Sequence, residues 1–182
     1  MVGSEFDHYL YDWSRDGRHI LFCEVNPQSK LDLWVLPTDK GKPRPFLKTA
    51  FNEDTPRFSP DSKWVAYASD ESGRNEIYVT RFPKGNGKRQ LSTMGGTLPR
   101  WSGDGREVFY ESADGQIMSV SVREVAGSLE SSTPRRLFAN PLLGRHYEPS
   151  PRGDRFLVMT PSEGRSLNEL TVLLNWQAGL PR

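Results

Sequence analysis

One short motif occurs four times in this 182-residue chain and constrains its fold more than any other feature. The copies read YDWSRDGRHILF, PRFSPDSKWVAY, PRWSGDGREVFY and YEPSPRGDRFLV, beginning at residues 11, 56, 99 and 147. Their serines (Ser14, Ser59, Ser102 and Ser150) are 45, 43 and 48 residues apart. Repeats of roughly 40 to 50 residues are typical of propeller blades and of some helical repeats.

The residues around each serine favour propeller blades. Glycine suits a left-handed turn position in three copies, at Gly17, Gly105 and Gly153, and Ser62 takes that position in the second copy at a cost in strain. Runs rich in β-branched and aromatic residues follow each turn, first HILFCEV, WVAYAS, EVFYES and RFLVMT, then LDLWVL, EIYVTRF, QIMSVSV and LTVLLNW. Such runs predict strands. We therefore predict an all-β propeller of four-stranded antiparallel blades.

The repeat spacing predicts about four blades per chain, over residues 7–51, 52–94, 95–140 and 141–176. The opening MVGSEF, residues 1–6, is typical of a cloning junction and is left out of the fold. Residues 127–136, GSLESSTPRR, are predicted to be a loop or short linker from their composition. The last blade is expected to be incomplete, because only QAGLPR follows LTVLLNW.

Incomplete end blades would leave unpaired edges and an exposed apolar blade face. We therefore expect a homodimer that closes an eight-blade ring through two identical junctions. The alternative is a closed ring of four blades within one chain.

Composition excludes several classes of function. The 24 basic and 23 acidic residues give a net charge of +1, so no patch for nucleic acid or an anionic membrane is predicted. The single cysteine excludes an intramolecular disulfide, and Cys23 lies within HILFCEV, where a buried and inert thiol is expected. No apolar run approaches the length of a membrane span, and no signal-peptide pattern is present.

Two longer stretches, PRFSPDSKWVAYASDESGRNEIYVTRFP and PRWSGDGREVFYESADGQIMSVSV, resemble the Pro-Asp repeat of TolB-like propellers. The phrases TRFP, LLGRHYEPSPRGDRFLVM and LTVLLNWQAGL resemble the C-terminal propellers of bacterial membrane-anchored serine/threonine kinases. That resemblance implies a sensor or scaffold in the periplasm or elsewhere outside the cytoplasm. The chain contains no glycine-rich ATP loop, His-Arg-Asp or Asp-Phe-Gly motif, so it is not the kinase.

The repeat also predicts a candidate ligand site. The residues two positions before the motif serines occupy one equivalent place on the innermost strands, and they are Asp12, Arg57, Arg100 and Glu148. If they face the channel, they form a polar pocket for an anionic or zwitterionic ligand, because arginine presents fork-shaped donors. The alternative is a lining of salt bridges that satisfy one another.

A metal site is a second hypothesis, and no other cofactor is expected. His146 and Glu148 are one residue apart on a predicted strand, so both side chains lie on one face. Together with Asp12 or Asp54 they would offer nitrogen and oxygen ligands to a divalent ion. The four motif serines are predicted to be structural, because turn hydroxyls bond to nearby backbone.

Two functions follow. The first is a non-catalytic sensor or scaffold that binds a protein or small ligand through its channel or faces. The alternative is a metal-assisted or promiscuous hydrolase with its site in the channel.

Overall fold

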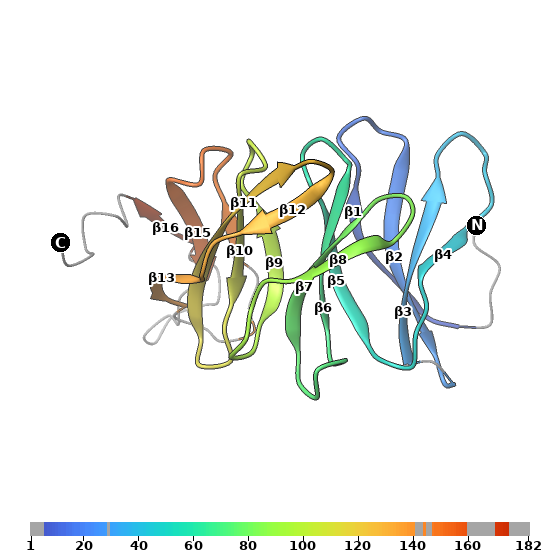
Figure 1. The fold of residues 1–182 in the computed structure, drawn as a ribbon, viewed down its shortest axis with the longest axis horizontal. Coiled ribbons are helices and arrows are strands. Elements are labelled where there is room, and N and C mark those ends of the chain that lie inside the picture. The colour runs from blue at the N-terminus through green and yellow to red at the C-terminus, as the bar shows by residue number, and fades with distance from the viewer. Residues whose placement is uncertain (1–5, 29, 141–143, 145–146, 160–169, 175–182) are drawn as a thin grey trace.

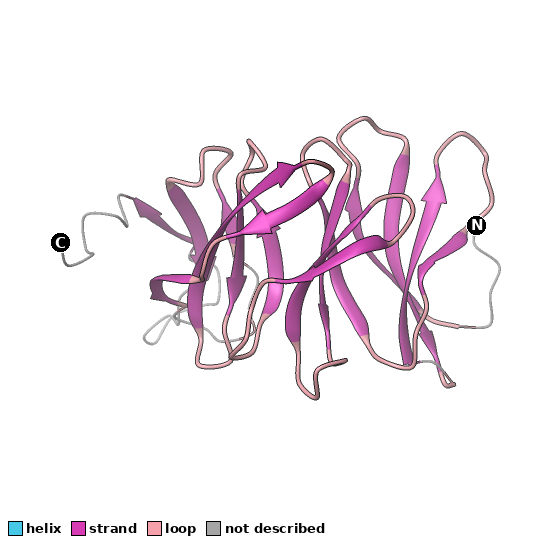
Figure 2. Ribbon diagram, viewed as in Figure 1, coloured by secondary structure: helices cyan, strands magenta, loops and turns pink. Residues whose placement is uncertain are grey.

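The computed structural model describes residues 6–28, 30–140, 144, 147–159 and 170–174. Within these residues the secondary structure consists of strands, which form four antiparallel sheets, and there is no helix (Figure 2). No described segment could therefore cross a membrane as a helix. The all-β propeller architecture predicted from the repeat is confirmed.

The first two sheets each contain four strands in chain order. The first consists of β1 (His8–Trp13), β2 (His19–Asn26), β3 (Lys30–Pro37) and β4 (Arg44–Leu47). The second consists of β5 (Glu53–Phe58), β6 (Trp64–Ser69), β7 (Glu76–Arg81) and β8 (Asn86–Gln90).

The third sheet has an additional strand, and the fourth is described in part. The third consists of β9 (Thr97–Trp101), β10 (Glu107–Glu111), β11 (Gln116–Val125), β12 (Ser128–Ser131) and β13 (Arg135–Ala139). The fourth consists of β14 (Glu148–Pro149), β15 (Arg155–Met159) and β16 (Leu170–Leu174). The expected lack of an outer strand in this sheet concerns residues 175–182, which lie outside the described residues.

The prediction of a loop or short linker over residues 127–136 is wrong, because the segment contains the strand β12. The first half of β11 pairs with β13 and its second half pairs with β12, so β11 and β12 form a projecting hairpin. Val122 and Leu129 of this hairpin join the apolar cluster between the second and third sheets, and Arg89 Nε donates to Ser131 Oγ at 2.8 Å. These contacts outweigh the weak strand preference of a Ser-rich segment.

The four motif serines hold the turns, as predicted. Ser59 is representative: its hydroxyl donates to Asp61 Oδ1 at 2.6 Å and accepts from the Trp64 N–H at 3.0 Å. The other three serines make the same pair of bonds, with the acceptor displaced to Asp154 in the fourth copy. The left-handed position is also confirmed, with φ of +57° at Ser62 and between +71° and +73° at the three equivalent glycines.

The sheets pack face to face through apolar side chains. Leu21 of the first sheet meets Phe58 of the second, and Phe109 of the third meets Phe156 of the fourth. Figure 1 shows the sheets in a row, with the first and last at opposite ends. A single chain is therefore an open arc, and the alternative of a closed four-blade ring is wrong.

Candidate functional site

The first strand of each sheet contributes one residue to a common site. Asp12 on β1, Arg57 on β5, Arg100 on β9 and Glu148 on β14 all line one hollow of about 150 Å³. We call these four residues the inner-strand cluster. Their equivalent places in the repeat bring them together, because each lies two residues before the serine that fixes its turn.

Arg100 is held in place by several contacts and is only 4% exposed. Its Nε donates to Glu148 Oε2 at 3.0 Å and its Nη1 donates to the Pro99 carbonyl at 2.9 Å. The guanidinium also lies 5.7 Å from the ring centre of Tyr147. The Glu148 side chain is 66% exposed, so this ion pair has one buried and one solvated partner.

Arg57 has spare hydrogen-bonding capacity. Its Nη1 donates to the Tyr11 carbonyl of the first sheet, while its Nε is buried and makes no hydrogen bond to the described residues. Burial, followed by the positive charge of Arg100, lowers the pKa of Arg57 below its ordinary value. An anion beside Arg57 would relieve both the unpaired donor and the repulsion between the two arginines.

Asp12 joins the first two sheets through backbone donors. Its Oδ2 accepts from the Phe58 N–H at 2.8 Å and its Oδ1 accepts from the Trp13 N–H at 2.9 Å. Burial raises the pKa of this carboxyl, although the two N–H groups and Arg57 oppose the shift. Asp12 therefore shapes the wall of the hollow.

The predicted metal set is not assembled by the described residues. Asp54 does not line the hollow; it accepts from the Tyr11 hydroxyl at 2.6 Å and from the Thr55 N–H at 2.7 Å. His146 lies outside the described residues. No group of three or more His, Cys, Asp or Glu side chains in the described part of the chain could hold a metal ion.

Cys23 is fully buried, as predicted. Its thiol lies 3.6 Å from the Glu53 carbonyl, and burial raises its pKa. A buried thiol of raised pKa is a poor nucleophile, so Cys23 is a packing residue.

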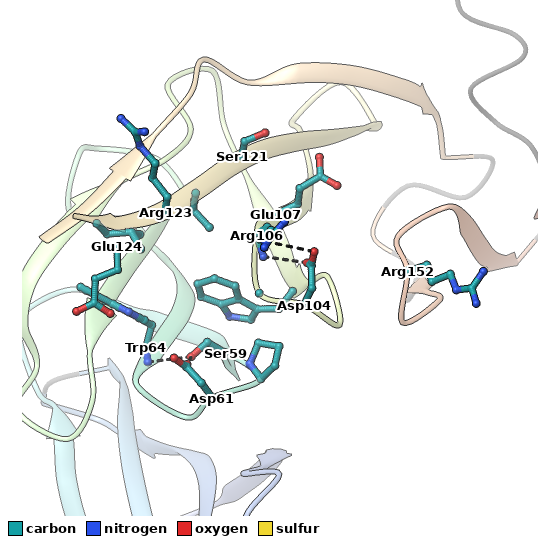
Figure 3. Close-up of a pocket in the computed structure, with 15 residues that line it drawn as sticks. Ser59, Asp61, Trp64, Asp104, Arg106, Glu107, Ser121, Arg123, Glu124 and Arg152 are labelled. Carbon is teal, nitrogen blue, oxygen red and sulfur yellow. Dashed lines mark hydrogen bonds and ion pairs between the residues drawn. The ribbon is translucent and has the colours of Figure 1, made fainter. Parts of the chain in front are cut away.

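Sequence reasoning missed a larger hollow, of about 690 Å³, between the second and third sheets (Figure 3). The β11–β12 hairpin supplies part of its wall, including Leu129, so the mistaken loop prediction hid it. Several of its charged groups have partners nearby: Glu124 pairs with Arg81, and Arg106 lies 3.9 Å from Asp104. The inner-strand cluster is the stronger candidate site because Arg57 retains a buried, unused donor.

No protein-family model matches the chain. An uncharacterized protein of Agrobacterium fabrum is 26% identical over 110 residues, which cover 60% of this chain and 37% of that protein. The uncharacterized peptidase YuxL of Bacillus subtilis is 27% identical over 95 residues, which cover 51% of this chain and 14% of that protein. The chain thus spans well under half the length of either relative.

Solved structures match nearly all of the chain at low sequence identity. An oligogalacturonate lyase in complex with manganese matches with a TM-score of 0.70 and 16% identity, over 98% of this chain and 53% of that one. TolB from Acinetobacter baumannii matches with a TM-score of 0.57 and 16% identity, over 95% and 53%. The chain spans about half the length of each structure. These similarities, together with the four stacked sheets, show that the chain has a TolB-like β-propeller fold.

Proposed function

We propose that this chain is a non-catalytic binding module, a sensor or scaffold, that takes a carboxylate-bearing ligand at the inner-strand cluster. The observation that carries the proposal is the pair of arginines at one hollow, one of which, Arg57, has a buried Nε that makes no hydrogen bond within the described part of the chain. Guanidinium forks match carboxylates in geometry, and hydrogen bonds between charged groups are stronger than neutral ones.

The acidic members of the cluster extend this chemistry to zwitterions. The Glu148 side chain is exposed and reaches the same hollow as Arg57. A ligand with both an ammonium and a carboxylate group could place the first near Glu148 and the second at Arg57. A free anion would instead compete with Glu148 for Arg100.

The hydrolase alternative has less support from the described residues. The motif serines are engaged in their turns and Cys23 is buried. The compared proteins include an enzyme, the lyase, as well as TolB, so the fold is compatible with either function. We also infer a location outside the cytoplasm from the TolB-like fold.

Titration calorimetry tests the binding site, with succinate and L-glutamate as probes and the neutral succinamide as control ligand. We expect both carboxylates to bind and succinamide not to bind. Arg57→Gln should weaken binding at least about tenfold, since losing one charged hydrogen bond costs roughly 1.5 kcal/mol or more. Arg57→Lys should also weaken it, because lysine keeps the charge and loses the fork.

Two further variants guard against a folding artefact. Arg44→Gln changes an exposed arginine on β4 and should leave binding unchanged. Glu148→Gln should strengthen succinate binding, because it releases Arg100 Nε from its ion pair. Absence of carboxylate binding at millimolar concentration, or equal binding by Arg57→Gln and the unmodified chain, would overturn the proposal.

A further inference from the structure

Two large apolar side chains of the first sheet are open to solvent, whereas Phe22 on the same face is 1% exposed and contacts the His8 ring. Leu10 and Trp13 of β1 are 76% and 60% exposed. In the strand register Leu10 lies opposite Phe22 and Trp13 lies opposite Ile20, so these side chains share one face of the sheet. Leu21 on the other face packs against the second sheet. We call the face with Leu10 and Trp13 the leading face.

The repeat shows what the leading face is built to contact. Trp13 occupies the same place in its motif as Trp101, each directly before the serine. Trp101 packs against the apolar cluster between the second and third sheets and donates from Nε1 to the Arg57 carbonyl at 3.1 Å. Trp13 is therefore equivalent to the residue by which the third sheet contacts the sheet that precedes it.

The fourth sheet presents the complementary half of that contact. Phe156 and Val158 are buried against the third sheet, whereas Leu157 and Met159 alternate with them and are each 37% exposed. Leu157 is equivalent in the repeat to Ala66, which is buried between the second and third sheets. We call the face with Leu157 and Met159 the trailing face.

We propose that a second copy of this chain docks its trailing face on the leading face of the first, and that the reverse contact closes a ring of eight sheets. Each junction would repeat the sheet-to-sheet interface already made three times within the chain. A two-fold pairing fills both open faces with two identical junctions, and eight sheets lie within the usual range for propellers. The solved structures that the chain matches are about twice its length, which is also what two copies supply.

The junction also completes the hollow of the inner-strand cluster. Trp13 and Asp12 line that hollow at one end of the arc, and Glu148 lines it at the other. Docking would place Asp12 and Trp13 of one copy beside Glu148 of the second copy. By analogy with Trp101, the indole N–H of Trp13 would then donate to the carbonyl of that Glu148. The docking rests on the two faces and does not depend on any ligand.

Light scattering after size exclusion, over a series of concentrations, tests the proposal. The unmodified chain should show twice its mass of 20.7 kDa and dissociate only on dilution. Leu10→Lys and Leu157→Lys should each shift the dissociation constant at least about a hundredfold, because a charge would be buried in both junctions. Met94→Lys is the matched control: Met94 is 78% exposed but belongs to neither face, so this variant should stay dimeric.

Mixing the two damaged variants tests the head-to-tail arrangement. Each variant alone has two damaged junctions, since every junction uses one leading and one trailing face. A mixture can form one intact junction, from the leading face of Leu157→Lys and the trailing face of Leu10→Lys. We therefore expect the mixture to recover a mass of two chains.

Three results would overturn the proposal. A single-chain mass at every concentration would mean that the faces receive another occupant, such as further blades of a longer polypeptide. A dimer that is lost in Leu10→Lys but kept in Leu157→Lys would mean that two leading faces pair with each other. Growth beyond two chains would mean that head-to-tail contacts continue without closing.

Discussion

The interface between the second and third sheets and the leading face of the first sheet are built from the same repeat, yet one is closed and the other is open. Trp101 is packed on its neighbouring sheet and hydrogen-bonded to it, whereas Trp13 is 60% exposed. The tryptophan before the motif serine can therefore pack on a preceding sheet. It contributes to the stability of the chain only where such a sheet is present.

The largest expected difference is between alanine variants of the two tryptophans. Trp101→Ala should lower the free energy of unfolding by about 3 kcal/mol, because it removes apolar contacts and leaves the Arg57 carbonyl without its indole donor. Trp13→Ala should change it by less than about 0.5 kcal/mol in dilute solution, where the leading face is in water. Urea unfolding of both variants makes the measurement. Equal losses would contradict the assignment of one closed and one open face.

The closed interfaces also bury ionisable groups, among them the carboxyl of Glu53 on β5. It is 2% exposed and accepts from the Thr49 hydroxyl. Burial, with smaller contributions from Asp32 and Glu71, raises the pKa of Glu53 from 4.5 to about 7. The folded chain therefore favours the protonated carboxyl more than the unfolded chain does.

This shift has a definite sign in a pH titration of stability. The contribution of Glu53 is fully present below about pH 4.5 and is lost as the pH rises through about 7. Glu53→Gln should remove that loss and be more stable than the unmodified chain above pH 7, by on the order of 2 kcal/mol. Thermal unfolding at several pH values measures this difference in stability. Glu130→Gln, at an exposed position, is the control and should keep the pH dependence of the unmodified chain. The same pH dependence in Glu53→Gln would contradict the prediction.

Sequence alone predicted the fold because every local signal agreed. Each turn has its serine, its acidic partner and its left-handed position, and the runs that follow alternate apolar side chains between two packed faces. The residues of the inner-strand cluster were also found this way, since equivalent repeat positions lie at equivalent places in stacked sheets. The structure places all four at one hollow.

The contacts between sheets could not be predicted in the same way. Asp54 was predicted, as an alternative to Asp12, to join His146 and Glu148 as a metal ligand, but its carboxylate accepts from the Tyr11 hydroxyl across the first interface. The β11–β12 hairpin was missed because Leu129 finds its apolar partners on another sheet. In both cases the contacting residue is dozens of positions away in the sequence, so local composition could not predict the contact.

The smallest expected effect compares the turns of the first two sheets. Ser62 has a φ of +57°, a conformation that strains a residue with a Cβ, while Gly17 occupies the equivalent position at +73°. Ser62→Gly should raise the free energy of unfolding by about 0.5 kcal/mol, because relief of strain slightly exceeds the added chain entropy of glycine. Gly17→Ser should lower it by a similar amount; a Cβ there would meet no atom within 4 Å, so only backbone strain is measured.

If both substitutions are neutral, the turn conformation is not under strain, and the serine that anchors each hairpin tolerates either residue. If they have the opposite signs expected, the turn position obeys the same energetics at the open end of the arc as in its interior. The first repeat would then be as well formed as the second, although none of the other described sheets packs on its leading face.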